Sequence, residues 1–304
     1  MHSSTLSSLP EDTYKFIVCD SLSRTVRDFN VYEVGPRDGL QNASFSVSTQ
    51  EKVDLIRSLS NAGLTQMEVG SFVNPKLVPS MADSAEVFEE VADYGDFSVL
   101  VPNEKGLDRA LRAGVENFNI FFSPSEVFNS RNLGRTREQA MVDYMRMLDR
   151  IPDSKVRVYL SVIFGCPFEG KIPDDVIYES ILEASLLGDT VVLCDTIGQA
   201  TKHEIRKVCE YADDFKADFA LHLHHKPDEE ERALALVEEA IAGGITEIDA
   251  SIGGLGGCPF IPGSSGNVAT EKLLNIPGYD CGIDSDSLLP AIEWVSKRKR
   301  EVVL

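Results

Sequence analysis

Short apolar segments rich in β-branched and aromatic residues alternate along this chain with amphipathic segments of helical period. Eight of the apolar segments have the length of strands that are buried on both faces. They lie at 29–34, 64–69, 97–101, 117–122, 155–163, 190–194, 219–223 and 247–250. Eight successive strand–helix units without a break in composition predict an α/β fold, a single-domain (β/α)₈ barrel (TIM barrel) over residues 29–304. We expect residues 1–28 to form a short N-terminal extension.

Recognisable end signals accompany the helical segments. Ser48 followed by Glu51 predicts a capping box, at the start of a helix that stops at Gly63. Pro227 is typical of a first helical turn, and apolar residues at helical spacing follow it as far as Gly243. A doubly wound open sheet is the alternative architecture. It requires a glycine-rich phosphate loop after the first strand, and the sequence VGPRDGLQN is not such a loop, which favours the barrel.

Composition restricts the cellular compartments in which we expect this protein. The chain has 304 residues, of which 43% are hydrophobic and 26% charged, as in an ordinary globular protein. No apolar run approaches the roughly 18 residues that span a bilayer. The start MHSSTLSSLP lacks the basic and apolar regions of a secretory signal. Six cysteines without a CxxC pair indicate reduced thiols, so we expect a cytoplasmic protein.

Charge limits the partners. Lys and Arg total 29 against 49 Asp and Glu, a formal net charge of −20. Such a field disfavours nucleic acid and anionic membranes as partners. An anionic substrate therefore requires a local basic group or a metal ion.

Polar side chains follow each of the eight expected strands. In a barrel all of these positions lie at the carboxyl ends of the strands, where active sites of this fold occur. They are Arg37, Asp38, Glu68, Asn103, Ser125, Glu126, Cys166, Glu169, Asp195, His222, His224, Cys258 and Asn267. The sequence therefore predicts an active site at this end.

The triplet His222-Leu223-His224 is the sharpest local signal. Side chains two residues apart on a strand point to the same side, so both imidazoles can bind one ion. With the carboxylate of Asp38 they make a nitrogen and oxygen ligand set for a divalent metal. The alternative is a pair of packed or solvent-facing histidines.

Residues 251–267, SIGGLGGCPFIPGSSGN, contain six glycines and two prolines and predict a shaped loop. Cys258 on this loop could exchange a proton with a substrate, or be a small buried cysteine. Asn267 offers an amide oxygen as a metal ligand, or is a turn residue.

Three charged residues complete the expected site. Arg37 could stabilise a developing enolate oxygen, or form a surface ion pair with Asp38. Glu68 could orient that arginine or a metal-bound water. Asp195, which follows a nearly apolar strand, is a polar candidate whose alternative role is to cap a helix.

Several stretches of the chain resemble 3-hydroxy-3-methylglutaryl-CoA lyases, of the DRE-TIM metallolyase superfamily. They are EVGPRDGLQN at 33–42, EVGSFVNPKLVPSMAD at 68–83, GCPFEG at 165–170, CDTIG at 194–198, HLH at 222–224 and GGLGGCPFIPGSSGNVATE at 253–271. The resemblance implies retro-aldol cleavage of a 3-hydroxyacyl-CoA to acetyl-CoA and a keto acid.

The resemblance also implies roles for individual residues. Asp38, His222, His224 and Asn267 would bind magnesium or manganese, with zinc as an alternative. Arg37 would stabilise the enolate, and Cys258 would carry a proton. Glu68 and Asp195 would belong to the inner polar shell, and either His222 or Asp195 would accept the hydroxyl proton. Lys76, in the stretch NPKLVP, is a candidate for the CoA phosphates, with an exposed surface lysine as the alternative.

Three departures from the family pattern surround the expected site. His225-Lys226-Pro227 stands where Asp-Thr-Tyr is usual, Ala43-Ser44 replaces a charged pair, and Val69-Gly70 replaces small hydroxyl residues. These changes leave the expected metal and thiol residues in place. They predict that the substrate is hydroxymethylglutaryl-CoA or a close relative of it.

Two other functions are weighed against the lyase. An acyl-CoA synthase of the same superfamily would run a Claisen or aldol condensation, and such enzymes usually carry a different eighth loop. A non-catalytic barrel that acts as a binding subunit would be expected to have lost Asp38, a histidine or Cys258. We expect an acyl-CoA substrate, a homo-oligomer, and neither nucleic acid nor membrane as partner.

Overall fold

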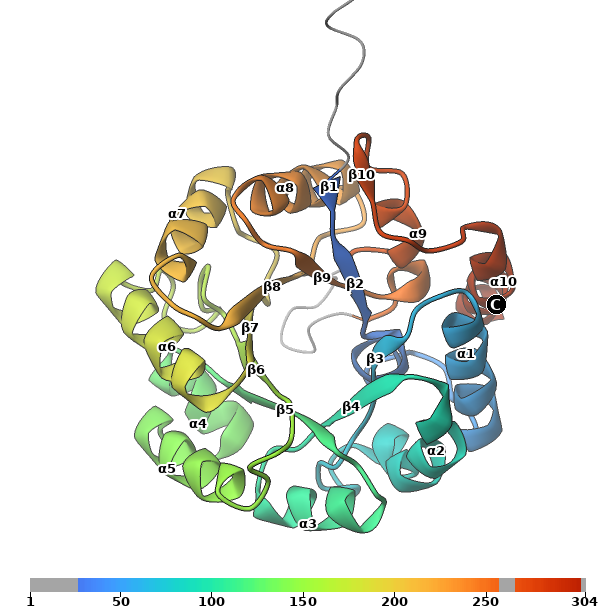
Figure 1. Ribbon diagram of the computed structural model, residues 1–304, viewed down its shortest axis with the longest axis horizontal. Coiled ribbons are helices and arrows are strands. Elements are labelled where there is room, and N and C mark those ends of the chain that lie inside the picture. Colours follow the sequence, from blue (N-terminus) through green and yellow to red (C-terminus); the bar gives the residue numbers. More distant parts are fainter. Residues whose placement is uncertain (1–26, 257–265, 302–304) are drawn as a thin grey trace, which may run out of the picture.

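The computed structural model describes residues 27–256 and 266–301 and shows the expected barrel (Figure 1). Eight parallel strands close on themselves in chain order, because β2 pairs with both β3 and β9. The barrel strands are β2 Asn30–Glu33, β3 Gln66–Ser71, β4 Asp96–Leu100, β5 Asn117–Phe122, β6 Val156–Leu160, β7 Thr190–Asp195, β8 Asp218–Leu223 and β9 Glu247–Ala250. Outside the barrel, β1 Arg27–Asp28 pairs with β10 Tyr279–Asp280.

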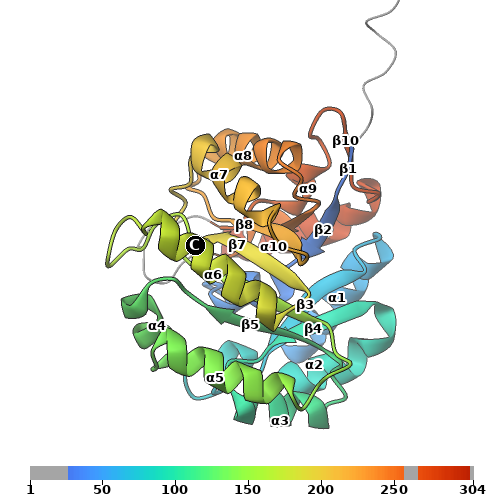
Figure 2. The ribbon, with the colours of Figure 1, turned by 60° about the vertical axis from the view of Figure 1, so that its left-hand side comes forward.

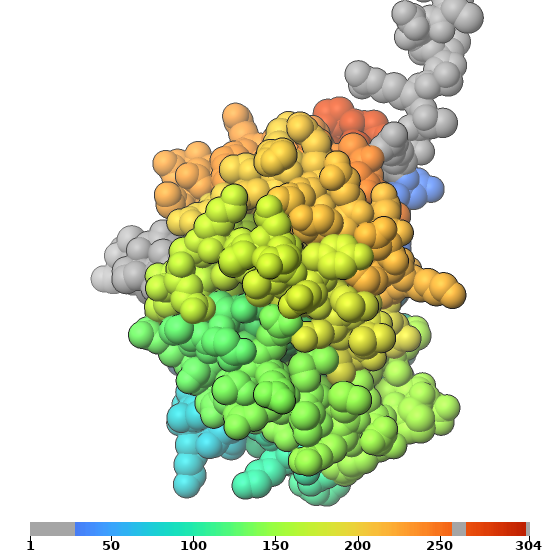
Figure 3. Space-filling model, turned by 90° about the vertical axis from the view of Figure 1, so that its left-hand side faces the viewer, coloured from blue at the N-terminus to red at the C-terminus, as the bar shows by residue number. Residues whose placement is uncertain are grey.

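Helices surround the barrel on all sides (Figures 1 and 2). They are α1 Thr49–Asn61, α2 Ser84–Val91, α3 Glu104–Arg112, α4 Glu126–Leu133, α5 Arg137–Leu148, α6 Asp174–Leu187, α7 Lys202–Ala212, α8 Glu230–Ala242, α9 Thr270–Leu273 and α10 Leu289–Glu301. Short helical turns are η2 Gly35–Gly39, η3 Pro79–Met81, η4 Ala92–Tyr94, η5 Ile252–Gly254 and η6 Asp286–Leu288. Side chains of α5, α6 and α7 form a continuous outer wall in the space-filling view (Figure 3). Among the described residues, no helix has the length and apolar character needed to cross a membrane.

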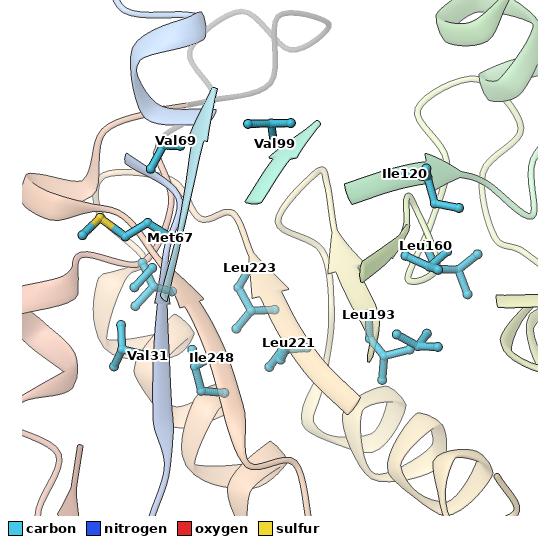
Figure 4. Close-up of a cluster of buried hydrophobic side chains, with 14 of the residues drawn as sticks. Val31, Met67, Val69, Val99, Ile120, Leu160, Leu193, Leu221, Leu223 and Ile248 are labelled. Atoms are coloured by element: carbon cyan, nitrogen blue, oxygen red, sulfur yellow. The ribbon is translucent and has the colours of Figure 1, made fainter. Parts of the chain in front are cut away.

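Alternation along the strands divides buried side chains into two sets. The outward set is mainly apolar, with Glu33 and Asp195 as exceptions, and its apolar members pack with the helices, for example with Ile56 and Leu107, in one continuous cluster. Figure 4 shows strand residues of this layer, among them Val31, Met67, Val69, Val99, Ile120, Leu160, Leu193, Leu221, Leu223 and Ile248. The inward set includes Tyr32, Glu68, Ser98, Asn119, Arg157, Tyr159, His222 and Asp249, all buried. The interior of this barrel is therefore unusually polar.

The predicted capping box at Ser48 is confirmed. The Ser48 hydroxyl accepts a hydrogen bond from the Glu51 backbone N–H at 3.3 Å, and the Glu51 carboxylate accepts one from the Ser48 N–H at 2.9 Å. The predicted start of a helix at Pro227 is wrong, because α8 begins at Glu230. The Glu229 N–H instead donates to the Lys226 carbonyl at 2.9 Å, which makes Pro227 part of a turn before the helix.

Several strand boundaries differ from the prediction, and two of these differences have a clear local cause. The expected strand at 155–163 ends at Leu160, because Val162 has a φ of 55° and the Gly165 N–H donates back to the Val162 carbonyl. The expected strand at 64–69 begins only at Gln66, because the Leu64 N–H still bonds to the Leu59 carbonyl at the end of α1. In both cases an apolar residue of the turn extended the apparent strand.

Candidate active site

Asp38 reaches the barrel mouth on a tight turn directly after β2. The Val34 carbonyl accepts hydrogen bonds from the N–H groups of Arg37, Asp38 and Gly39, at 3.2, 2.7 and 3.2 Å. Pro36 in the first turn of η2 suits this conformation. The turn therefore holds two adjacent charged side chains at the carboxyl end of the barrel.

The structure brings Asp38, His222 and His224 together as predicted. One ligand atom from each lies within 4.8 Å of the others, and all three residues are buried. The Nε2 atoms of the two histidines are 3.1 Å apart, and His224 Nε2 is 3.6 Å from Asp38 Oδ2. The histidines come from β8 and the bridge after it, whereas Asp38 follows β2 on another side of the barrel mouth.

The other ring nitrogen of each histidine is already bonded. His222 Nδ1 is 3.0 Å from Asp249 Oδ2, and His224 Nδ1 is 3.1 Å from the Thr196 carbonyl. When each Nδ1–H donates to its oxygen, each Nε2 presents a lone pair toward the other. Two facing lone pairs at this distance repel unless a cation lies between them. The pair therefore suits a divalent metal ion.

Asn267 supplies a further oxygen at the same place. Its Nδ2 donates to Asp38 Oδ2 and to the Leu255 carbonyl, each at 2.8 Å. Its buried Oδ1 receives no hydrogen bond from any described residue, which costs about 1–3 kcal/mol unless another group binds it. A side chain at Gly256, whose φ is +116°, would lie 2.4 Å from Asn267 Nδ2. These features fit an amide oxygen that is a metal ligand.

Arg37 is buried beside these ligands, which excludes the surface ion pair considered from the sequence. Its Nη1 donates to Asp38 Oδ1 at 2.9 Å, and its Nε donates to Glu68. Burial opposes the charge of Arg37, but Glu68 and Asp38 raise its pKa above the usual value. Burial likewise opposes ionisation of Asp38, yet Arg37 and His224 hold the pKa of that carboxyl well below its usual range. The two side chains are thus an ionised pair.

A cavity of about 180 Å³ opens beside this group. Its polar wall consists of Arg37, Asp38, Gln41, Asn42, Asn132, Ser161, Thr196, His222 and His224. Its less polar wall consists of Leu100, Phe121, Phe128, Tyr159 and Cys194. A lining that combines charged candidate metal ligands with aromatic side chains suits a ligand that has both polar and apolar parts.

Asp195 does not line this cavity. Cys194 is in register with His222, so these two share the inward face and Asp195 points outward. Its carboxylate accepts hydrogen bonds from the N–H groups of Gln199 and Ala200, at 2.9 and 2.8 Å. It does not cap a helix, because Thr201 caps α7. Asp195 therefore stabilises the loop that carries Thr196.

Other candidates have structural partners or lie elsewhere. Asn103 caps α3 and Ser125 caps α4. Ser125 also bonds to Glu169 and lies 3.1 Å from the buried Cys166 thiol. Lys76 is exposed on the loop after β3 and does not line the cavity. Cys258 lies outside the described residues.

Sequence reasoning missed Asp249, which supports His222 from inside the barrel. Asp249 is almost fully buried and also accepts a hydrogen bond from Arg157. Burial opposes its ionisation, but the charge of Arg157 lowers the pKa of Asp249 below its usual value. Acidic residues at the alternate positions 247 and 249 of a short strand, Glu247 and Asp249, are the signal that could have found it.

One known protein family matches most of this chain. The family model described as HMGL-like matches residues 28–291. The chain belongs to the HMGL-like family. It is 35% identical to the hydroxymethylglutaryl-CoA lyase YngG of Bacillus subtilis over 280 residues, covering 88% of this chain and 92% of the relative. It is 38% identical to a 3-hydroxy-3-isohexenylglutaryl-CoA/hydroxymethylglutaryl-CoA lyase of Pseudomonas aeruginosa over 269 residues, covering 85% and 89%.

The fold agrees with that family assignment. The solved structure of an HMG-CoA lyase from Acinetobacter baumannii in complex with coenzyme A and 3-methylmalate matches with a TM-score of 0.81. Its identity to this chain is 33%, and the match covers 88% of this chain and 90% of that one. The resemblance to 3-hydroxy-3-methylglutaryl-CoA lyases is thus confirmed over most of the chain.

The unusual His225 does not line the cavity. Its N–H donates to the Gly266 carbonyl at 3.3 Å, and its Nδ1 lies 2.9 Å from the Lys226 carbonyl. Val69 faces the outer apolar layer, and a side chain at Gly70 would lie 2.9 Å from Ser84. These departures therefore change the surroundings of the cavity without altering the residues around the candidate metal site.

Glu33 is a buried carboxylate that ties together three segments next to the site. Its Oε1 accepts from the N–H groups of Gly35 and Ile252, at 2.8 and 2.9 Å, and its Oε2 accepts from the Thr270 hydroxyl at 2.5 Å. Burial raises the pKa of Glu33 to about 7 in spite of these bonds, and the Glu271 carboxylate acts in the same direction. Glu33 therefore titrates near neutral pH.

We expect this titration to make the metal-free protein less stable as the pH rises from 5 to 8. A carboxyl whose pKa is raised on folding binds more protons in the folded state, so its contribution is present at low pH and lost through pH 7. Glu33→Gln keeps partners for all three hydrogen bonds and removes the titration. Chemical denaturation with EDTA should show the wild type losing about 3 kcal/mol more than the variant over this range. Parallel stability curves would contradict the prediction.

Proposed function

We propose that this chain is a divalent-metal-dependent carbon–carbon lyase that cleaves 3-hydroxy-3-methylglutaryl-CoA, or a close relative of it, to acetyl-CoA and a keto acid. The observation that carries the proposal is the buried group of Asp38, His222 and His224, with the side chain of Asn267 bonded to Asp38 and its Oδ1 without a hydrogen bond from any described residue. Membership of the HMGL-like family supports the reaction, and the relative from Bacillus subtilis is named for it. An acyl-CoA substrate agrees with the coenzyme A in the Acinetobacter structure.

The reaction is a retro-aldol cleavage. The hydroxyl at C3 loses its proton, the bond between C2 and C3 breaks, and a ketone forms at C3. The electron pair passes to the thioester as an enolate, which is then protonated at C2 to give acetyl-CoA. A divalent ion bound by the four ligands supplies a Lewis acid that makes the hydroxyl more acidic. We propose magnesium or manganese, since both accept carboxylate and amide oxygens, with zinc as the alternative.

Arg37 stabilises the enolate in this proposal. Its guanidinium lines the cavity and keeps its charge, and contacts with Glu68 and Asp38 limit its movement. Fixed positive charge in a buried site lowers the barrier because no water has to reorganise around the developing oxyanion. Cys258 is proposed as the group that transfers a proton to C2.

Of the two proposed acceptors of the hydroxyl proton, His222 lines the cavity and Asp195 does not. Because Asp249 already bonds to its Nδ1, His222 would accept the proton through Nε2, in place of that nitrogen's bond to the ion. Both oxygens of Asp195 already accept backbone hydrogen bonds on the outer side of the strand. We therefore assign to Asp195 the positioning of the loop that carries Thr196.

Lys76 is proposed to contact the CoA phosphates when the substrate is bound.

The substituent at C3 of the substrate is proposed to lie against the apolar wall of the cavity. Leu100, Phe121 and Phe128 are the apolar side chains that line this cavity. The Pseudomonas aeruginosa relative is named for substrates with a methyl and with a longer isohexenyl group at this carbon. A methyl group is our first choice, and a longer alkenyl group is the second.

The full-length chain incubated with hydroxymethylglutaryl-CoA and Mg²⁺ or Mn²⁺ should release acetyl-CoA and acetoacetate in equal amounts. The parallel reactions use EDTA as the metal-free control, and the isohexenyl analogue as the alternative substrate. Coupled assays for both products give the rate. Condensation of acetyl-CoA with a keto acid, without cleavage of either substrate, would replace the lyase by the synthase. No reaction in either direction would indicate a binding protein.

A further inference from the structure

A row of buried polar side chains crosses the barrel interior and ends at Arg37. Asn119, on β5, is fully buried, and its Nδ2 donates to Glu68 Oε1 at 2.8 Å. The other oxygen of Glu68 accepts from Arg37 Nε. Asn119 Nδ2 also lies 3.2 Å from the Tyr32 hydroxyl, which bonds in turn to Ser98. The row thus spans the neighbouring strands β2 to β5 beneath the cavity.

Tyr32 also contacts the support of His222. The Arg157 guanidinium lies 3.8 Å from the centre of the Tyr32 ring, and Arg157 bonds to Asp249. Asp249 in turn is bonded to His222 Nδ1. Tyr32 is therefore linked to Arg37 through its hydroxyl, Asn119 and Glu68, and to His222 through its ring, Arg157 and Asp249. Both Arg37 and His222 line the cavity.

A cavity reduces the packing below this polar layer. A second cavity, of about 510 Å³, lies at the amino-terminal end of the barrel and is lined by Tyr32, Ser98, Asn119 and Arg157 among others. Barrel interiors are ordinarily filled by layers of bulky apolar side chains. Where such a layer is replaced by a cavity, hydrogen bonds must supply the restraint on the side chains above it. Burying an amide, a phenol and a carboxylate here is costly unless they are mutually bonded.

We propose that Asn119 and Tyr32 are positioning residues for Arg37. Asn119 fixes the Glu68 carboxylate, and Glu68 holds the guanidinium with its charge toward the reacting oxygen. Tyr32 fixes the amide of Asn119. The catalytic part of this inference rests on the proposed lyase function, whereas the positioning of Arg37 is a property of the protein without substrate.

The variant Asn119→Leu tests the proposal, since it keeps the volume and removes the donor to Glu68. We expect kcat to fall by about 10- to 100-fold, with KM and metal content unchanged. In an Arg37→Lys background the same change should lower kcat less than about twofold. The orientation of the guanidinium that Asn119 maintains is already lost in that background. An equal loss in both backgrounds would show a merely structural role and overturn the proposal.

Asn117→Leu is the matched control. Asn117 lies on the same strand and the same face as Asn119, but it donates to Asp96 and to the Phe97 carbonyl rather than to Glu68. Its kcat should stay within about twofold of the wild type. If Asn119→Leu fails to fold, Tyr32→Phe is the alternative variant, because it removes only a single hydroxyl. It should lower kcat several-fold in the wild-type background and much less in the Arg37→Lys background.

A measurement without substrate separates this inference from the proposed function. The Nε–H signal of Arg37, assigned by its loss in Arg37→Lys, can be followed by ¹⁵N NMR. Its exchange with water should be slow in the wild type and in Asn117→Leu, and faster in Asn119→Leu. Unchanged exchange in Asn119→Leu would overturn the positioning role. Slow exchange in a wild type that cleaves no acyl-CoA would overturn the lyase function alone.

Discussion

Asp38→Asn is expected to remove the bound metal and to abolish cleavage. Asp38 is the anionic member of the candidate ligand group, and its Oδ2 lies 3.6 Å from His224 Nε2. Asparagine keeps the shape and can still accept the hydrogen bond from Asn267, but it lacks the charge that attracts a divalent cation. A loss of several kcal/mol of electrostatic stabilisation corresponds to a decrease in turnover of about 10³-fold or more.

Two measurements on the same preparation check this prediction. Elemental analysis after desalting gives the metal content, and the product assay gives kcat at saturating substrate with added Mg²⁺ or Mn²⁺. Asp54→Asn, an exposed change of the same type on α1, is the control and should match the wild type in both. Full metal occupancy in Asp38→Asn would remove Asp38 from the ligand set.

Arg37→Lys is expected to lower kcat by about 10³-fold while the metal content changes little. Lysine retains one positive charge but lacks the planar guanidinium, whose several N–H donors can form a fork of two hydrogen bonds. Arginine bonds to Glu68 through Nε and to Asp38 through Nη1 at the same time, which aligns the guanidinium with the cavity. A single ammonium group cannot keep both contacts and also face the developing oxyanion.

The control for this substitution is Arg206→Lys. Arg206 is an exposed residue of α7 that bonds to both carboxylate oxygens of Glu239. The same chemical change away from the cavity should leave kcat unaltered. A rate for Arg37→Lys within about threefold of the wild type would show that charge alone suffices and that the fork geometry is not used.

The residues of the candidate metal site could be predicted from sequence because each depends on a local pattern. The spacing of His222 and His224 places both on one face of a strand whatever the rest of the fold does. Asp38 follows the first barrel strand, so closure of the barrel alone brings it to the same end. The four ligands proposed from the sequence, Asn267 included, lie together in the structure.

Contacts inside the barrel could not be predicted in this way. Asp195 was expected in the inner polar shell, but the register of β7 against β8 gives the inward position to Cys194. A shift of one residue in register reverses the face of every side chain on a strand, and the apolar run 190–194 carries no alternation that would reveal it. Asp195 consequently supports a loop.

The sequence by itself determined the eight alternating strands and helices, the end of the barrel at which the candidate site lies, and the candidate metal-binding group. Only the tertiary structure decided what holds these groups in place. Arg157 and Asp249 are 92 residues apart, and Asn119 and Tyr32 are 87 apart, so no local pattern links them. Such pairs form only when closure of the barrel places inward side chains of distant strands in contact, away from water, where each polar group requires a partner.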